Sequence, residues 1–233
     1  MRILAVDTAT ENCSAALLIS EQLLTREQRL DRGHAEAILP MVDELLKEAG
    51  TPLAAFDAIA FGRGPGAFTG VRLAASVAQG LAFGAGVPVV PVSDLRALAQ
   101  RAFDEERAVD RVLVCADARM HEVYWGCFER SAADLARAAG EEQVGKPALV
   151  RLPQPWSAPA GEAVWGAGSG FAAYPGLRAA LGAQAAQVFA DFLPRASEIA
   201  RLAAAEVTAG RILPAEQALP VYLRDDVTHR GSR

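Results

Sequence analysis

The sequence predicts an α/β protein built from two similar halves. Short apolar runs typical of buried strands alternate with longer segments of helical periodicity, and the first half follows the order β-β-(β)-α-β-α-β-α. The opening pattern of apolar run, acid, turn and second apolar run recurs after the charged run 104–110. We therefore expect a first lobe at 1–105, a second lobe at 106–223 and a polar tail at 224–233.

The elements of the first half each have a local signal. Two apolar runs with a short connection predict a hairpin at the start of the chain, and the polar segment after it has a weaker strand signal. Apolar residues at helical spacing predict a first helix, which Gly50 ends. The predicted strands are 3–6, 13–19, 58–61 and 87–92, with a weaker one within 21–31, and the predicted helices are 33–49, 69–84 and about 94–103.

The second half is less regular. Strands are predicted at 112–116 and 123–128, joined by the turn 117–122, and the proline-rich segment 146–159 favours edge strands and loops. The glycines at 166–170 predict a flexible loop after a short strand at 163–165. A last helix is predicted at 197–209, with Ser197 as its N-cap, and it is a candidate to pack back on the first lobe.

The composition restricts the function classes. Its 233 residues and 52% hydrophobic content support one large or two small globular domains. The net charge of −5 argues against tight nucleic-acid binding by this chain alone, with a local basic patch left open. Three widely spaced cysteines without a CxxC pair do not predict a zinc site or a disulfide framework.

The compartment is expected to be the cytoplasm. Asp7 comes too early for a signal peptide, and no apolar run is long enough to suggest a membrane span.

The segment 62–70 is the most informative part of the chain. Four glycines and a proline stand between a predicted strand and a predicted helix, without the Gly-Lys-Ser/Thr ending of a Walker loop. Two interpretations stay open: amides that bind an anion at the helix start, with Thr69 as N-cap, or a tight turn that allows close packing, which we favour slightly. The residues that would lie near a phosphate or nucleotide are Asp7, Thr8, Gly64, Gly66 and Thr69.

Other candidate sites have weak signals. Asp7 at a strand end is as consistent with a turn as with a phosphate or metal site, and His34 has Ile38 instead of a second ligand at i+4. No nucleophile elbow surrounds Ser169. The turn at Asp117-Ala118-Arg119 is either a structural ion pair or part of the cleft between the lobes, and the residues leave both open.

The helix at 69–84 is apolar on two sides, and both sides cannot face the same core. With the helix at 33–49 it forms a half-bundle that another protein can complete, so we predict a partner interface here. The two stripes are Val71, Ala74, Ala75, Ala78 and Leu81, and Leu73, Val77 and Gly80. The predicted interface residues are His34, Ile38, Val42, Leu45, Val71, Leu73, Ala74, Val77, Ala78 and Leu81.

Five segments in this order, at 3–10, 32–40, 62–72, 117–124 and 220–224, closely resemble the bacterial TsaB (YeaZ) family. The resemblance spans nearly the whole chain and is most specific in residues 1–100. It implies the actin/Hsp70/sugar-kinase (ASKHA) fold in two lobes. It also implies a role in placing threonylcarbamoyl on adenosine 37 of tRNAs that read codons starting with A.

The resemblance further implies a non-catalytic partner of TsaD, with TsaE as the ATPase of the set and tRNA bound only through the complex. It implies no cofactor in this chain alone, with ATP or ADP, if bound, at the complex interface. TsaD carries a His-x-x-x-His metal motif, and the matching positions here are Asp94 and Leu98, so no metal is expected. The exposed patch predicts a homodimer when the chain is isolated. An ATP-dependent phosphotransferase is the alternative, and a peptidase is the third hypothesis.

Overall fold

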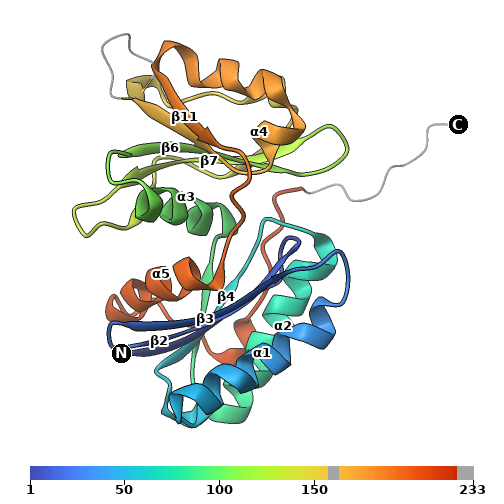
Figure 1. Ribbon diagram of the computed structural model, residues 1–233, viewed down its shortest axis with the longest axis vertical. Helices are drawn as coiled ribbons and strands as arrows, with labels where there is room; N and C mark the ends of the chain where they lie inside the picture. Colours follow the sequence, from blue (N-terminus) through green and yellow to red (C-terminus); the bar gives the residue numbers. More distant parts are fainter. Residues whose placement is uncertain (157–162, 225–233) are drawn as a thin grey trace, which may run out of the picture.

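Two sheets, one from each half of the chain, form the frame of the molecule (Figure 1). The computed structural model describes residues 1–156 and 163–224. The first sheet has the order β3-β2-β1-β4-β5, and the second has the order β11-β10-β6-β7-β8, with β9 paired to β7. The strands of the first sheet are β1 (Arg2–Asp7), β2 (Asn12–Ile19), β3 (Gln22–Arg29), β4 (Ala58–Gly62) and β5 (Val89–Val92). Those of the second are β6 (Arg111–Asp117), β7 (Val123–Arg130), β8 (Ala136–Ala138), β9 (Gln143–Gly145), β10 (Val164–Ala167) and β11 (Ala185–Phe189).

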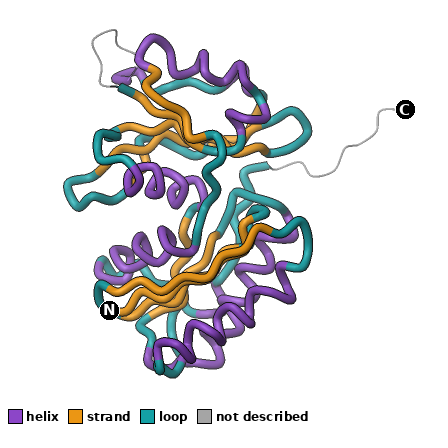
Figure 2. The backbone as a smooth tube through the Cα atoms, in the orientation of Figure 1, coloured by secondary structure: helices purple, strands orange, loops and turns teal. Residues whose placement is uncertain are grey.

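Helices cover both faces of both sheets, so the predicted α/β fold class is confirmed (Figure 2). One pair lies on the outer face of the first sheet, a second pair lies between the sheets, and α4 with a 3-10 helix covers the outer face of the second sheet. The α-helices are α1 (His34–Ala49), α2 (Phe68–Ala85), α3 (Asp94–Glu105), α4 (Gly170–Ala173) and α5 (Ala196–Thr208). The 3-10 helices are η1 (Leu53–Ala55), η2 (Pro147–Leu149), η3 (Gln154–Trp156), η4 (Pro175–Gln184) and η5 (Ala215–Gln217).

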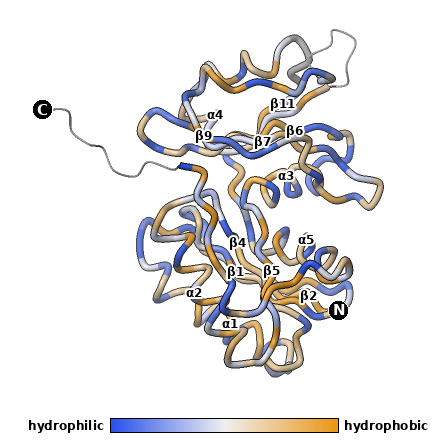
Figure 3. Tube along the Cα trace, turned by 180° about the vertical axis from the view of Figure 1, so that it is seen from behind, coloured by the Kyte–Doolittle hydropathy of each residue, from blue (hydrophilic) through white to orange (hydrophobic). Residues whose placement is uncertain are grey.

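The alternation of side chains along each strand divides the interior into three cores. On β1, Ile3 and Ala5 face the central core between the sheets, whereas Leu4 and Val6 face the core under α1 and α2. Because both faces of the sheet are covered, the strand is a continuous apolar run instead of an alternating one. Figure 3 shows hydrophobic stretches following the strands of the first sheet. Among the described residues, no helix has the length and apolar character needed to cross a membrane.

The two central helices exchange lobes. The helix α5, from the end of the chain, packs on β1, β2, β4 and β5 of the first sheet. The helix α3, which comes before the predicted boundary at residue 105, packs on β6, β7 and β8 of the second sheet. The prediction assigned α3 to the first lobe because it precedes the charged run, but its buried face is complementary to the second sheet. Contacts between α3 and α5 therefore join the two lobes, including the Arg201–Asp104 ion pair at 2.5 Å.

Two residues predicted as N-caps lie inside their helices instead. Thr69 lies inside the first turn of α2, whose N-cap is Ala67, because the Ala67 carbonyl accepts the first helical hydrogen bond, from the Val71 amide at 2.9 Å. Ser197 lies inside α5, whose N-cap is Arg195, and the Ala196 amide donates to Ser14 Oγ at 3.0 Å. Gly50 has a left-handed backbone and ends α1 as predicted.

Two irregular segments also differ from the prediction. In the described part of 146–159, the chain forms the 3-10 helices η2 and η3 instead of edge strands, and residues 157–159 lie outside the described residues. The predicted flexible loop at 166–170 is packed structure. Gly166 lies in β10, and a Cβ on Gly168 or Gly170 would lie 2.5 or 2.8 Å from the Cys115 carbonyl oxygen. Of the predicted polar tail, 225–233 lies outside the described residues.

Candidate functional site

The Gly-rich loop between β4 and α2 lies directly against the turn that follows β1. A Cβ on Gly66 would lie 2.6 Å from the Ala9 carbonyl oxygen, and one on Gly70 would lie 2.0 Å from the Thr8 carbonyl oxygen. Gly64 has a φ of +96°, a conformation that L side chains rarely adopt. The glycines therefore allow backbone to pack on backbone at this point.

Two buried carboxyl groups meet beneath the loop. Asp7 is 0% exposed and Asp94 is 2% exposed. Asp7 Oδ1 accepts a hydrogen bond from the Ala9 amide at 2.9 Å, and Asp94 Oδ2 accepts one from the Gly64 amide at 2.5 Å. Among the described residues, Asp7 Oδ2 and Asp94 Oδ1 are buried and have no hydrogen-bond partner.

Both carboxyl groups are harder to ionise than an exposed carboxyl group. Burial raises the pKa of Asp7 to about 6, against the hydrogen bonds that it accepts. Burial, and then the charge of Asp7, raise the pKa of Asp94 well above its ordinary value of 3.8. These shifts favour a proton on the pair, and they favour it more strongly on Asp94 than on Asp7. Because two ionised carboxylates would repel each other in a low dielectric, a proton shared by the pair would stabilise the arrangement.

The structure brings together only some of the residues that were predicted to lie near a phosphate. Asp7, Thr8, Gly64 and Gly66 lie at one place, but Thr8 is 1% exposed and its hydroxyl donates to the Gly70 carbonyl at 2.7 Å. Thr69 is exposed in the first turn of α2. The polar groups of this cluster are thus engaged with one another, and these contacts support the interpretation of a packing turn.

The predicted interface residues divide between the core and the surface. Leu73, Val77 and Leu81 are half-buried, and His34 is half-buried with its Nε2 2.9 Å from the Thr10 carbonyl oxygen. The other six predicted interface residues are buried, so a partner cannot contact them directly. They are Ile38, Val42, Leu45, Val71, Ala74 and Ala78, which lie in or beside the core under α1 and α2.

The outward face of α2 consists of small and apolar side chains. We call Leu73, Ser76, Val77, Gly80 and Phe83 the α2 face. Phe83 is 80% exposed, and a Cβ on Gly80 would meet nothing within 4 Å. Exposure of a large aromatic side chain next to small residues is typical of a surface that another protein covers.

The C-terminal segment 215–224, here named the strap, borders this face. Gln79 Nε2 donates to the Ala215 carbonyl at 3.2 Å. Nearer the start of α2, the Arg72 guanidinium lies 3.2 Å from the ring centroid of Phe68 and 4.9 Å from that of Tyr222. These rings are 55% and 47% exposed, so the strap adds aromatic area to the surface beside α2.

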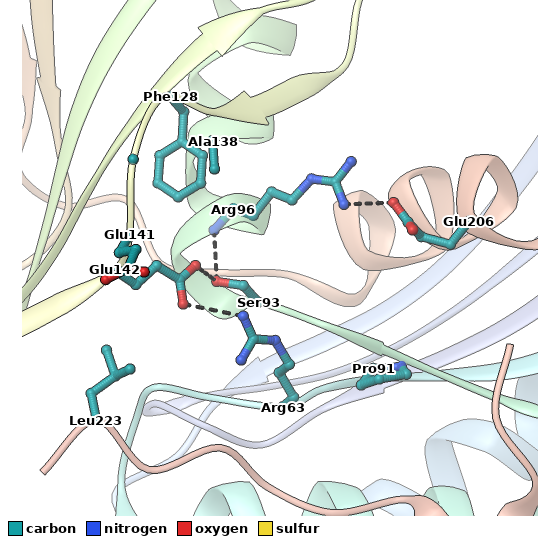
Figure 4. A pocket seen from close by; sticks show the side chains of 11 residues that line it. Arg63, Pro91, Ser93, Arg96, Phe128, Ala138, Glu141, Glu142, Glu206 and Leu223 are labelled. Atoms are coloured by element: carbon teal, nitrogen blue, oxygen red, sulfur yellow. Dashed lines mark hydrogen bonds and ion pairs between the residues drawn. The ribbon is translucent and has the colours of Figure 1, made fainter. Parts of the chain in front are cut away.

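A cavity of about 460 Å³ lies between the two lobes (Figure 4). Arg63 Nη2 lies 3.2 Å from Glu142 Oε2, and the Ser93 hydroxyl donates to Glu142 Oε1. Arg96 Nη1 lies 2.7 Å from Glu206 Oε1. Sequence reasoning missed these five residues, and only Ser93, a serine just before a helix, had a signal that could have found it. They come from distant segments, and no motif links them.

The remaining candidates have structural partners. Ser169 Oγ accepts from the Asp117 amide at 3.1 Å, and Tyr174 donates to Asp117 Oδ1 at 3.2 Å. Asp117 and Arg119 form an ion pair at 3.4 Å, with the Arg119 side chain 88% exposed. Within the described residues, no group of three or more His, Cys, Asp or Glu side chains is arranged to hold a metal ion.

The chain is similar to known proteins over nearly its whole length. A family model described as TsaD, tRNA N6-adenosine threonylcarbamoyltransferase, matches residues 24–230. Two relatives are each named tRNA threonylcarbamoyladenosine biosynthesis protein TsaB. The Escherichia coli (strain K12) protein is 41% identical over 232 residues, covering 97% of this chain and 96% of the relative. The Haemophilus influenzae protein is 39% identical over 239 residues, covering 98% and 95%.

Solved structures agree with this similarity. An uncharacterized Pseudomonas aeruginosa protein with similarity to peptidase YeaZ has a TM-score of 0.87 and 48% identity, covering 96% of this chain and 99% of the other. A structure of YeaZ from Pseudomonas aeruginosa has a TM-score of 0.85 and 47% identity, covering 95% and 99%.

Proposed function

The chain belongs to the TsaB family of tRNA threonylcarbamoyladenosine biosynthesis proteins, and we propose that it serves there as a non-catalytic subunit that binds and activates TsaD. The modification made by the complex is N6-threonylcarbamoyladenosine at position 37 of tRNAs reading ANN codons. The chain contacts tRNA only within the complex, and TsaE supplies the ATPase activity. Isolated from its partner, the chain forms a homodimer through the same surface.

The observation that carries this proposal is the state of Asp94 and Leu98, which match the two metal-binding histidines of TsaD. Asp94 is buried and accepts a hydrogen bond from the Gly64 amide. Leu98 is 2% exposed and packs in the central core. A leucine has no ligand atom, and the Asp94 carboxyl is inaccessible from solvent, so the catalytic metal chemistry of the relative has no counterpart at these positions.

The α2 face supports binding to a partner. Val77 and Leu73 are only half-buried, and Phe83 projects from the same face. Gly80 allows a second helix to approach closely, because no side chain stands between the two backbones. The surface thus offers apolar area that association would remove from water.

The phosphotransferase alternative needs an accessible carboxylate, whereas Asp7 is fully buried and accepts a hydrogen bond from the Ala9 amide. The peptidase hypothesis needs a nucleophile. Burial raises the pKa of Cys13 to about 11 and the pKa of Cys127 to about 12, so these thiols stay protonated. Because Asp7 is buried, we also propose that this chain alone binds no nucleotide. Any ATP or ADP is held at the interface with TsaD.

The test is complex formation with TsaD of the same organism, measured by size-exclusion chromatography and by titration calorimetry. We expect the wild-type chain to bind TsaD and to restore tRNA threonylcarbamoylation to TsaD and TsaE, while the chain alone has no transferase, ATPase or peptidase activity. Absence of a complex at micromolar concentrations, or activity of the chain alone, would overturn the proposal.

A matched pair of variants locates the interface. Gly80→Glu adds a carboxylate where the free protein has open space, so the fold is kept while the complex would bury an unpaired charge. We expect affinity for TsaD to fall by at least about tenfold, since burial of an unpaired polar group costs at least ~1–3 kcal/mol. Ala172→Glu, at an exposed position of α4 in the second lobe, is the control and should bind like the wild type.

A further inference from the structure

The side chain of Glu142 crosses from the second lobe to the first. It projects from the connection between β8 and β9, and its carboxylate meets Arg63 of the Gly-rich loop and Ser93 at the start of α3. The Glu142 side chain is only 11% exposed, and that of Arg63 is 26% exposed (Figure 4). Because the pair is largely removed from solvent, loss of either partner leaves a charge without compensation.

Arg63 is tied to three separate segments. Its amide donates to the Val92 carbonyl at the end of β5 at 2.8 Å. Its carbonyl accepts from the Val221 amide of the strap, also at 2.8 Å. Its guanidinium binds Glu142 of the second lobe. A single residue at the beginning of the Gly-rich loop therefore contacts the first sheet, the strap and the second lobe.

The position of Arg63 is transmitted to α2 through a short stretch of chain. The next residue, Gly64, is held by Asp94 through its amide, and the Asp94 amide donates back to the Gly64 carbonyl at 3.1 Å. Four residues after Gly64 the chain enters α2 at Phe68. The strap, whose Val221 amide binds the Arg63 carbonyl, carries Tyr222 next to it, and Tyr222 lies against Arg72 of α2.

The charge of Glu142 also acts on the buried acid pair. Burial and the charge of Asp7 are the larger causes that raise the pKa of Asp94, and the carboxylate of Glu142 adds to them. The titratable groups that interact with Asp94 and Asp7 from neighbouring elements include Glu142, His34 of α1 and Cys13 of β2. Glu142 therefore favours the protonated form of Asp94, whereas the hydrogen bond from the Gly64 amide favours the ionised form.

We propose that Glu142 is an interlobe latch, a positioning residue that couples the second lobe to the Gly-rich loop and so holds α2 and the strap in the arrangement that TsaD binds. This rests on the proposed function, because it assigns a control element to the same docking surface. In the closed latch, Arg63 and Ser93 share one carboxylate, and the first turn of α2 is fixed. Without the Glu142 carboxylate, the loop keeps its hydrogen bond to Asp94 but loses its ion pair with the second lobe.

The test uses Glu142→Gln beside Glu141→Gln. The glutamine keeps the size of the side chain and a hydrogen-bonding oxygen but removes the charge that Arg63 binds. Glu141 is the neighbouring exposed residue, and within the described residues its side chain has no ion pair. Hydrogen exchange of the isolated chain is measured for peptides covering residues 63–72 and, as an internal reference, α5.

We expect Glu142→Gln to exchange about tenfold faster over residues 63–72, the size of effect that loss of a charge-assisted hydrogen bond gives. We expect its affinity for TsaD to fall about five- to tenfold, within the usual range of coupling between sites. Glu141→Gln should match the wild type in both measurements, and α5 should exchange normally in all three proteins.

The pair interaction is isolated by a double-mutant cycle with Arg63→Gln and Arg63→Gln/Glu142→Gln. If Glu142 acts through Arg63, the double variant binds TsaD no more weakly than the worse single variant. If Glu142→Gln does not fold, Arg63→Gln removes the same ion pair while Glu142 keeps its hydrogen bond from Ser93.

Unchanged exchange at 63–72 in Glu142→Gln overturns the latch, and so does faster exchange with unchanged affinity for TsaD, because the coupling to docking would then be absent. If the wild-type chain itself does not bind TsaD, the proposed function fails. The exchange measurement still decides whether Glu142 holds the loop in the isolated protein.

Discussion

Asp7 and Asp94 bring two carboxyl groups together above the Cα atom of Gly62, inside the first lobe. A Cβ on Gly62 would lie 2.4 Å from Asp94 Oδ1 and 2.6 Å from Asp7 Oδ1. The pair therefore exists only because position 62 lacks a side chain. It links the end of β1 to the start of α3, and it holds the Gly-rich loop through the Gly64 amide.

The first prediction concerns the pH dependence of stability. Both carboxyl groups have pKa values raised above 3.8, so the folded chain keeps protons that the unfolded chain releases. Their contribution is fully present below about pH 4 and is lost as the pH rises through the folded-state values. Asp94→Asn keeps an acceptor for Gly64 and a donor for Asp7 without titrating. We expect its free energy of unfolding to exceed that of the wild type by about 1–3 kcal/mol at pH 8 and by less at about pH 4.5.

Urea denaturation of both proteins at the two pH values makes the comparison, since other titrating groups cancel in the difference. A variant that is less stable than the wild type at pH 8, or a difference that does not grow with pH, would contradict the shared-proton description.

The second prediction concerns Gly62. Gly62→Ala places a methyl group against the two carboxyl oxygens, which cannot move apart without losing Gly64 or Ala9. We expect a loss of about 3 kcal/mol in the free energy of unfolding, at the upper end of usual overpacking costs. Gly84→Ala is the control, because it lies in α2 with open space around it and should gain about 0.5–1 kcal/mol from helix propensity. Equal stability of the two variants would refute the close packing at Gly62.

The third prediction separates the core of α2 from its surface. Ala78 is 0% exposed, so Ala78→Glu should unfold the protein or cost more than about 4 kcal/mol. Val77 is half-buried at the α2 face, so Val77→Glu should fold and lose TsaD binding instead. Circular dichroism measures folding, and calorimetry measures binding. A folded Ala78→Glu, or a Val77→Glu that binds TsaD normally, would show that the two faces are assigned incorrectly.

The fourth prediction concerns the ion pairs of Glu206 with Arg96 and Arg211. Burial opposes ionisation of Glu206, but the hydrogen bonds from Arg211 and Arg96 outweigh it and lower the pKa. A lowered pKa gives stability that is present above the ordinary value of 4.5 and is lost as the pH falls through the folded-state value. Glu206→Gln should therefore cost about 1–2 kcal/mol at pH 7, and the cost should shrink in acid. A cost that is constant with pH would mean that Glu206 contributes through packing alone.

The sequence by itself determined the local structure and the family. Apolar periodicity located the strands of the first sheet, β6, β7 and the long helices, because burial of alternate or every third-to-fourth side chain leaves a pattern that neighbouring residues carry. It did not predict β8, β9 or β11. The glycines at 62–70 predicted a close approach of backbones, and the family resemblance placed Asp94 and Leu98 where TsaD has histidines. None of these features depends on which distant segments pack together.

Only the tertiary structure decided which surfaces meet. The sequence showed two apolar stripes on α2, but the position of the first sheet buried Ala78 and left Val77 near the surface. It also predicted α3 in the first lobe, whereas the exchange of α3 and α5 follows from which sheet each buried face fits. The contact of Glu142 with Arg63 arises from that packing of the lobes. Such a pair leaves no local pattern, because its two residues share a place in space and not a segment of the chain.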